Sequence, residues 1–324
     1  MTPVALLQLR GTRVRMIASF AVAGLLFAVA GATRSTPVSG VGDGTRHESG
    51  RHDSTFMALF SGPLPAVTSD AGVKALEAGL TNGSYTLASV RDDGAAVPRL
   101  FLARVPVDLP TMDSVGTRKE TFVKMLLPLI LAENERILDD RNQLVRMRTI
   151  LDAGRSLSRV DTVWLAAIAD RYDLEFDADE VEDLLDELLL RVDVIPPSLA
   201  IGQAALETGW GTSAAARGQA MFGQMVFGDG DRAEVRRFER LAHAVEAYAL
   251  NLNTHNAYRK FREQRAGARS RDEVPSGYAL AAALARYSER KMDYVRDVRG
   301  IIKANKLQPL DRARLDVHPQ LAGG

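Results

Sequence analysis

The segment from residue 196 to residue 213 constrains the fold more than any other part of the chain. It begins with two adjacent prolines, continues with a mostly small and apolar stretch, and ends with the sequence Gly-Trp-Gly-Thr-Ser. Proline is favoured in the first turn of a helix and glycine just after its last turn, so this pattern predicts a helix. Because a helix that is apolar on nearly every side is normally buried, we expect protein to surround it.

This helix carries a single carboxylate, Glu207, near its C-terminal end. An unpaired carboxylate is costly to bury, and burial raises its pKa because it disfavours the charged form. A proton donor that stays protonated near neutral pH needs such a position. Trp210 follows three residues later, and we expect its ring on the same side of the helix. An acid beside an aromatic surface suggests a site that cleaves sugars; a glutamate that merely faces water at a helix end is the alternative.

The composition is ordinary for a globular protein and argues against several functional classes. The 324 residues are 46% hydrophobic and 25% charged, and 41 basic side chains balance 41 acidic ones. A neutral balance without a basic, aromatic-rich stripe argues against a nucleic-acid partner. Cysteine is absent, which excludes disulfides, zinc-thiolate sites and a cysteine nucleophile.

The first residues, 1–32, have the features of an export segment. Arg10, Arg13 and Arg15 precede an uncharged apolar run that ends in small residues. This is the anatomy of a bacterial secretory signal, and a run of about 17 residues also reaches the lower limit for spanning a bilayer. We expect a cleaved signal or an uncleaved inner-membrane anchor, and a periplasmic or other extracytoplasmic location. Residues 33–55 are rich in Gly, Ser, Thr and Arg and are expected to form a flexible linker.

The next stretch, residues 56–155, predicts a small accessory region of mixed α+β and helical structure. Turn signals separate two strand-like stretches, residues 85–90 and 99–103. From residue 118 to about residue 151, apolar residues recur at helical spacing and predict a long helix. Pro128 lies inside this helix and is expected to kink or break it.

The remaining sequence, residues 160–308, predicts a mainly helical domain with one β-hairpin. Residues 222–227 and 234–238 read as two strands joined by a Gly-Asp-Gly-Asp turn. Further helices are expected around residues 163–169, 179–191, 241–253, 256–264, 277–287 and 292–306. Residues 309–324 are expected to form a loose tail.

Several separate motifs resemble the glucosaminidase domains of glycoside hydrolase family 73, and in particular their Bax-like branch. These are bacterial hydrolases that cut the glycan strands of peptidoglycan. The resemblance rests on residues 196–213, 222–224, 235–238, 251–258 and 287–290, with further likeness at 97–101 and 127–129. It covers roughly residues 95–305. It implies a mainly α, lysozyme-like helical domain with a short β-hairpin lobe beside the cleft, preceded by the small α+β region and helices.

The resemblance also implies the residues of a site. Glu207 takes the place of the catalytic acid, which would protonate the glycosidic oxygen between N-acetylglucosamine and N-acetylmuramic acid. Glu234 and Tyr258 are candidates to assist it. The expected substrate-binding residues are Trp210, Gln203, Phe222, Gln224 and Tyr248. No metal or organic cofactor is implied, because proton transfer to a sugar oxygen needs neither.

The expected hairpin is shorter than in the family's pattern, and it is the lobe in which a second carboxylate is expected. Glu234 is the first candidate for that carboxylate, and Asp229 and Asp231 are further candidates. Two carboxylates about 5 Å apart would imply a retaining reaction, and a wider spacing an inverting one. A reaction in which the 2-acetamido group of the substrate is the nucleophile needs only one protein acid. We expect Glu207 to be the one essential acid, assisted by Tyr258 or Glu234.

Two other functions fit the same motifs. A lytic transglycosylase also works with one glutamate in a lysozyme-like fold, and it differs in leaving a 1,6-anhydro muramic end. A non-catalytic wall-binding protein would hold peptidoglycan without releasing fragments. In each case the expected partners are the glycan strands of peptidoglycan and, if the N-terminal segment is not cleaved, the inner membrane.

Overall fold

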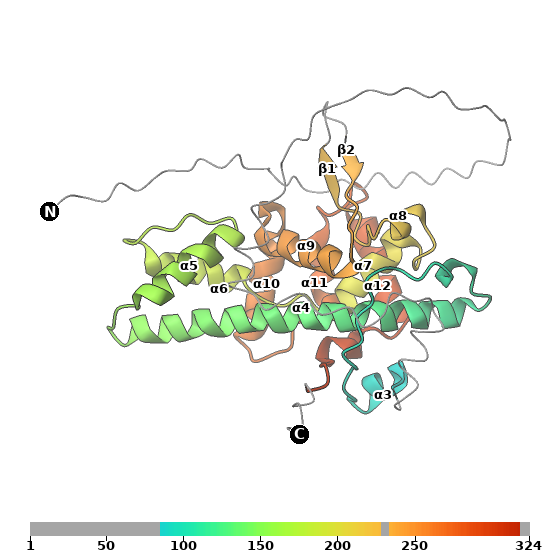
Figure 1. Cartoon of the computed structure of the whole chain (residues 1–324), viewed down its shortest axis with the longest axis horizontal. Helices are drawn as coiled ribbons and strands as arrows, with labels where there is room; N and C mark the ends of the chain where they lie inside the picture. The colour runs from blue at the N-terminus through green and yellow to red at the C-terminus, as the bar shows by residue number, and fades with distance from the viewer. Residues whose placement is uncertain (1–84, 228–232, 318–324) are drawn as a thin grey trace, which may run out of the picture.

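The computed structural model describes residues 85–227 and 233–317, which form a mainly helical body (Figure 1). The predicted export segment and linker lie outside the described residues. The longer elements are α3 (Leu87–Asp92), α4 (Val115–Asp152), α5 (Arg159–Arg171), α6 (Val181–Arg191), α7 (Pro197–Thr208), α8 (Ala214–Arg217), β1 (Met225–Phe227), β2 (Ala233–Val235), α9 (Leu241–Thr254), α10 (Arg259–Arg269), α11 (Gly277–Leu280) and α12 (Met292–Ala304). Short 3-10 helices occupy Leu109–Thr111, Asn256–Tyr258, Ala281–Leu284 and Gln308–Arg312. The expected mainly α class is confirmed. Among the described helices, none combines the length and the apolar character needed to cross a bilayer.

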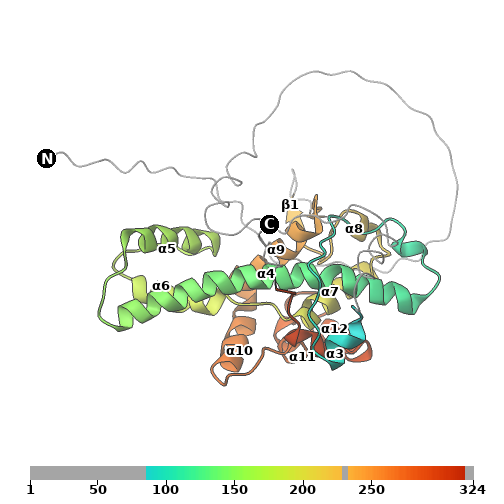
Figure 2. The same cartoon turned by 60° about the horizontal axis from the view of Figure 1, so that its bottom comes forward.

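The long helix α4 is the scaffold of the body, and α6, α7 and α9 pack against it (Figures 1 and 2). The Ser114 hydroxyl accepts a hydrogen bond from the backbone N–H of Thr117 and caps its first turn. The expected break at Pro128 does not occur, because the helix continues through this residue. A proline inside a helix costs about 3 kcal/mol or more, but each fully buried Leu, Ile or Phe contributes about 1.5–3 kcal/mol. Several such side chains, Phe122 and Leu126 among them, are buried around the proline.

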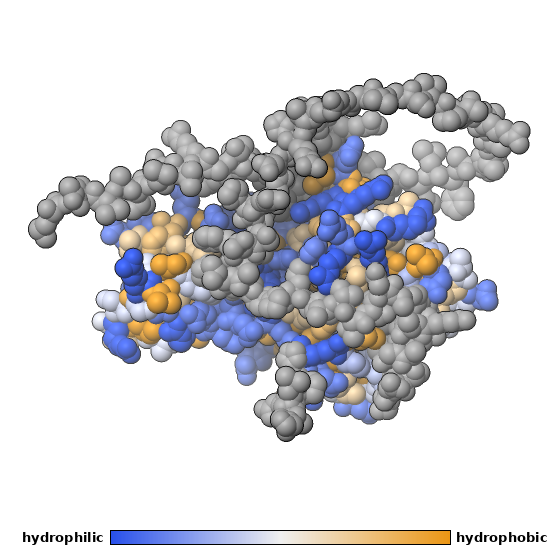
Figure 3. All heavy atoms as spheres, viewed as in Figure 1, coloured by the Kyte–Doolittle hydropathy of each residue, from blue (hydrophilic) through white to orange (hydrophobic). Residues whose placement is uncertain are grey.

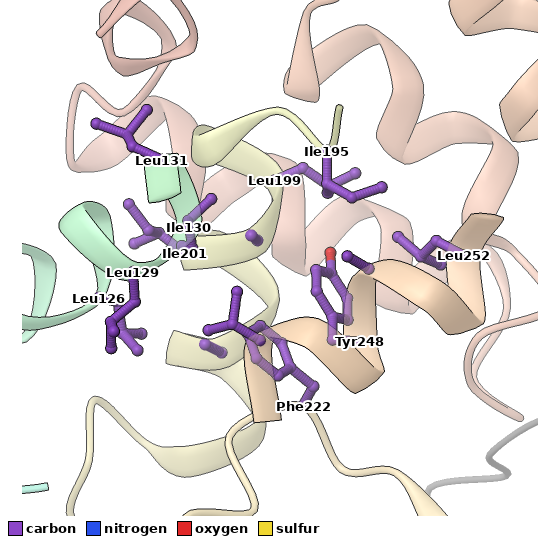
Figure 4. Close-up of a cluster of buried hydrophobic side chains, with 14 of the residues drawn as sticks. Leu126, Leu129, Ile130, Leu131, Ile195, Leu199, Ile201, Phe222, Tyr248 and Leu252 are labelled. Carbon is purple, nitrogen blue, oxygen red and sulfur yellow. The ribbon is translucent and has the colours of Figure 1, made fainter. Parts of the chain in front are cut away.

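Helix α7 is the buried helix that the sequence predicts. Ten of its 12 residues are buried, and Leu206 and Glu207 are the two that are not. It packs against α4, α11 and α12, and its apolar side chains join those of α4 and α9 in the core (Figure 4). The helix starts at Pro197 and ends at Thr208, and Gly209 then takes the left-handed conformation with φ of 57°. Glycine adopts this conformation without a steric penalty, so the helix ends here.

Helices α5 and α6 form one end of the body, beside the C-terminal half of α4 (Figure 1). The acidic helix α6 buries Leu184, Leu185 and Leu188 and exposes most of its carboxylates. On α5, Val160 and Val163 are exposed, and Figure 3 shows hydrophobic residues on the surface at this end. The predicted helices at both places are confirmed.

The two strands expected in the N-terminal accessory region are wrong. Residues 87–92 form helix α3, because the Thr86 and Ser89 side chains cap each other's backbone in a capping box. Residues 99–103 are irregular. In place of a local strand pair, Val97 forms a parallel bridge with Leu315 near the other end of the described chain. Local alternation of apolar residues in this region reflects burial rather than a sheet.

The predicted β-hairpin is present and is the one sheet in the described part of the chain. Strands β1 and β2 pair antiparallel, with Val226 opposite Glu234. The sheet is three residues wide on each side, and it projects from the body above α7 and α9 in Figure 1. The hairpin therefore extends beyond the end of α7 that carries Glu207.

Two expectations for the C-terminal part need correction. The helix predicted over residues 277–287 is regular only in α11, and a 3-10 turn and bends follow it. The expected loose tail is wrong for residues 310–315, because Leu310 and Leu315 are buried. Asp311 fixes this segment by accepting hydrogen bonds from the Ser198 N–H and hydroxyl and from the Gly277 N–H. Packing against α7 orders this segment, although its sequence has no strong local pattern.

Candidate active site

Glu207 lies in the last turn of α7, where the buried helix reaches the surface. Its side chain is partly exposed, whereas Gln203, one turn earlier, is fully buried. Burial raises the pKa of the Glu207 carboxyl to about 7, against opposing effects of a hydrogen bond from Tyr294 and the positive charge of Arg290. A carboxylic acid with this pKa is about half protonated at neutral pH. The site therefore holds the poised proton donor that the sequence predicts.

The backbone of Gly223 packs directly against this carboxyl group. Gly223 has a positive φ of 61°, and a Cβ atom built on it would lie 2.6 Å from Glu207 Oε2 and 3.1 Å from Cδ. Such distances are shorter than real contacts, so only glycine fits. The loop between α8 and β1 thus lies against the acid and limits its movement.

A chain of hydrogen bonds runs from Glu207 into the core. The Tyr294 hydroxyl on α12 hydrogen-bonds to the Glu207 carboxyl and accepts a hydrogen bond of 2.8 Å from Gln203 Nε2. The Tyr248 hydroxyl on α9 donates to Gln203 Oε1 at 2.7 Å. Gln203, predicted to bind substrate, is fully buried and uses its amide for these two tyrosines. The structure places it behind the acid.

The predicted aromatic residues Phe222 and Tyr248 lie together in the core next to this chain. Their rings stack with a centroid distance of 4.0 Å and an interplanar angle of 9°, and Figure 4 shows the pair beside α7. The Tyr287 hydroxyl donates to the Phe222 carbonyl at 2.6 Å, and the Tyr287 ring stacks on Tyr294. These contacts fix the loop that carries Gly223 relative to α12. Both predicted residues are buried, so in this structure they support the site from below.

Trp210 does not lie where the sequence placed it. The expected position on the same helix face as Glu207 is wrong, because α7 ends at Thr208 and Trp210 itself has a positive φ of 61°. Its ring packs edge-on against Phe122 of α4 at 5.6 Å, and Lys119 Nζ lies 4.9 Å from the ring centroid. The ring remains partly exposed, so its predicted role in binding substrate stays a prediction.

The residues expected to assist Glu207 are not in contact with it. Glu234 is exposed on β2, and it is absent from the charges that shift the pKa of Glu207. Tyr258 is fully buried between His255 and Tyr287, with its hydroxyl beside Asn251. Asp229 and Asp231 lie outside the described residues. The second catalytic group stays a prediction.

Gln224, predicted to bind substrate, follows Gly223 directly and is 5% exposed. Its backbone carbonyl accepts a hydrogen bond from the Arg236 N–H at 2.8 Å. Its side-chain Oε1 is buried without a hydrogen-bond partner in the described structure. A buried acceptor is normally paired, and Gln224 keeps its predicted role on that basis.

Sequence reasoning missed three residues that contact or influence the acid: Gly223, Arg290 and Tyr294. Arg290 had been interpreted as part of a solvated helix face, yet its charge lowers the pKa of Glu207. Tyr294 follows the motif at 287–290 by one helical turn, and this closeness to a recognised motif was the available signal. Gly223 stood inside the motif at 222–224, but no local pattern indicates which side chain its backbone will meet.

Neither a metal nor the clearest cavity accounts for the chemistry of the site. Within residues 85–227 and 233–317, no group of three or more His, Asp or Glu side chains is arranged to hold a metal ion. A cavity of about 430 Å³ lies at the opposite end of α7, with Pro196, Pro197 and Asp311 in its lining. The lining includes none of the residues around Glu207, so we assign the candidate site to the Glu207 end.

A mainly helical domain that holds one half-protonated carboxyl group at the end of a buried helix has the construction of a glycosidase-type domain. Comparison with known proteins agrees with this class. The family model for glucosaminidase, described as mannosyl-glycoprotein endo-beta-N-acetylglucosaminidase, matches residues 183–307. The chain is also 32% identical over 194 residues to Protein bax of Escherichia coli (strain K12), which covers 58% of this chain and 69% of that protein. The chain belongs to this glucosaminidase family. No solved structure matches it significantly.

Proposed function

We propose that the protein cleaves the β-1,4 glycosidic bonds of peptidoglycan glycan strands as an endo-β-N-acetylglucosaminidase, with Glu207 as the general acid. The observation that carries this proposal is the partly exposed carboxyl of Glu207, whose pKa burial raises to about 7. An efficient general acid has a pKa near the working pH, because it must be protonated and still release its proton readily. Membership of the glucosaminidase family supports a glycan substrate.

The reaction starts with proton transfer from Glu207 to the glycosidic oxygen. The bond between this oxygen and the anomeric carbon then breaks, and positive charge develops on the sugar ring. The described contacts of Glu207 include no second carboxylate. We therefore propose that the 2-acetamido oxygen of the substrate attacks the anomeric carbon and forms a cyclic intermediate. Water, deprotonated by the Glu207 carboxylate, then opens this intermediate and leaves a reducing N-acetylglucosamine end.

Digestion of purified sacculi by a version of the protein that starts at residue 34 tests this proposal. Mass spectrometry should find soluble fragments with reducing N-acetylglucosamine ends from the wild type and none from Glu207→Gln. The Glu234→Gln variant should retain most of the activity, because Glu234 is exposed and outside the contacts of the acid. Equal activity of Glu207→Gln and wild type would overturn the proposal.

The same single-acid arrangement supports a lytic transglycosylase as the second candidate. In that reaction the 6-hydroxyl group of muramic acid attacks the anomeric carbon, and the products carry 1,6-anhydro muramic ends. The mass spectra separate the two reactions directly. Binding to sacculi without release of any fragment would instead favour a non-catalytic wall-binding protein.

An extracytoplasmic location follows from this proposal, because peptidoglycan lies outside the cytoplasm. The basic and apolar residues of the first 32 positions are the sequence feature that favours export or inner-membrane anchoring. Fractionation of cells that express the full chain, with and without these residues, tests the location. Full retention of the intact chain in the cytoplasm would contradict it.

A further inference from the structure

The inference concerns the buried amide of Gln203 and rests on the proposed role of Glu207 as an acid. Gln203 lies one turn before Glu207 on α7, and its side chain is fully buried. Its amide bridges two tyrosines from distant helices, with Nε2 2.8 Å from the Tyr294 hydroxyl and Oε1 2.7 Å from the Tyr248 hydroxyl. The chain of groups Tyr248–Gln203–Tyr294–Glu207 therefore has a direction.

The direction follows from what each group can donate. The Gln203 Nε2 group is only a donor, so the Tyr294 oxygen accepts its hydrogen bond. Tyr294 has a single hydroxyl proton, and this proton is then free for the Glu207 carboxyl, with which it is hydrogen-bonded. A protonated carboxyl that accepts a hydrogen bond on one oxygen keeps its own proton on the other oxygen. The catalytic proton is thereby held on the oxygen that does not face Tyr294.

The opposite direction would hide the proton. If Oε1 of Gln203 faced Tyr294, the tyrosine would donate to the amide, and Glu207 would donate its proton to the tyrosine oxygen. The hydroxyl of Tyr248, whose ring is fixed by stacking on Phe222, donates to Oε1 and selects the first orientation. We propose that Gln203 is a positioning residue that acts through Tyr294 to keep the proton of Glu207 available for transfer to the substrate.

Two isosteric variants of Gln203 separate this role from simple packing. Gln203→Met keeps the volume and removes both hydrogen bonds. Tyr294 can then accept a hydrogen bond from the protonated acid, which favours the neutral form of Glu207. Gln203→Glu, when neutral in its buried position, again offers one donor and one acceptor. It should restore the wild-type direction in part. Ser198→Ala is the control, because Ser198 is a buried hydrogen-bonding residue of the same helix whose partner is Asp311.

The readouts are the titration of the Glu207 carboxyl by carbon-13 NMR, assigned by comparison with Glu207→Gln, and the pH dependence of kcat/KM on glycan strands. In Gln203→Met we expect the titration midpoint and the alkaline limb of the rate profile to move up by about 0.5 to 1 pH unit, the shift expected for one lost hydrogen bond. We expect kcat to fall roughly tenfold. Gln203→Glu should recover part of both, and Ser198→Ala should leave both midpoints unchanged.

A midpoint in Gln203→Met equal to that of the wild type would overturn the proposal, as would an equal shift in Ser198→Ala. If Gln203→Met does not fold, Tyr248→Phe carries the test, because it keeps the stacked ring and removes only the donor that orients the amide. A smaller shift in the same direction is then expected, and no shift would count against the proposal. The NMR titration does not depend on activity, so a wild type that releases no fragments refutes the proposed function while the titration still decides the role of Gln203.

Discussion

The backbone of Gly223 lies against the carboxyl group of Glu207, so closely that a Cβ atom at residue 223 would be 2.6 Å from Oε2. The two residues come from different parts of the domain, one from the end of α7 and the other from the loop before β1. This contact defines one wall of the site. It also makes the position of the acid sensitive to a single methyl group.

Gly223→Ala should therefore reduce activity much more than it reduces stability. The added Cβ displaces the carboxyl by part of an ångström, and a displacement of about 1 Å can cost about a hundredfold in rate. We expect a loss of at least tenfold in kcat/KM. Gly154→Ala is the matched control, because Gly154 has a similar positive φ of 69° but meets nothing within 4 Å. Equal kinetics for Gly223→Ala and wild type would contradict the contact.

The raised pKa of Glu207 predicts an opposite dependence of activity and stability on the same group. Its pKa of about 7 in the folded protein lies above the ordinary value of 4.5, so folding favours the protonated form. The stability that this form contributes is complete below about pH 4.5 and is lost as the pH rises through 7. Glu207→Gln removes this loss. It should gain stability relative to wild type between pH 5 and pH 8, by about 1–3 kcal/mol.

Urea unfolding at pH 5 and pH 8 measures this difference, provided that the folded state is intact at both values. Glu234→Gln serves as the control, because Glu234 is exposed on β2, and it should follow the wild type at both values. A Glu207→Gln variant whose stability relative to wild type is the same at both pH values would show that burial does not raise the pKa of the acid.

Arg290 should tune the acid through its charge. It lowers the pKa of Glu207 while its guanidinium pairs with Asp297 at 2.6 Å. Arg290→Ala should move the alkaline limb of the rate profile to higher pH by a few tenths of a unit, and high salt should reduce this shift because it screens exposed charges. Arg296→Ala removes a comparable exposed charge pair with Asp293 and should leave the limb in place. A shift of the same size in both variants would argue against a specific effect of Arg290.

Asp311 should prove essential for stability although it lies in the segment whose sequence suggested a loose tail. Its carboxyl accepts three hydrogen bonds, two from Ser198 and one from Gly277. Asp311→Ala leaves these donors unpaired at the start of α7 and α11, which should cost about 2–4 kcal/mol in unfolding free energy. Asp316→Ala is the comparison, because the hydrogen bonds of Asp316 to Val97 and Arg99 use its backbone. Thermal unfolding of both variants checks the prediction, and equal melting temperatures would refute it.

Much of the secondary structure could be predicted from the sequence, because it depends on residues that are close together. The apolar segment between Pro197 and Gly209 determined a buried helix with Glu207 at its end, and the structure agrees. Local patterns failed where a side-chain cap or a distant contact outweighed them. The Thr86 cap turned an expected strand into α3, and contacts with α7 ordered the segment around Asp311.

The arrangement around the acid depended on the tertiary structure alone. Gln203 and Tyr294 are 91 positions apart in sequence, and Gln203 and Tyr248 are 45 apart. No local preference encodes such pairs, because they arise when whole helix faces are buried together. The sequence by itself therefore determined that a carboxyl group would end a buried helix. The packing of α9, α12 and the Gly223 loop around that helix decided which atoms touch the carboxyl, and through hydrogen bonding and desolvation which form of it is stable.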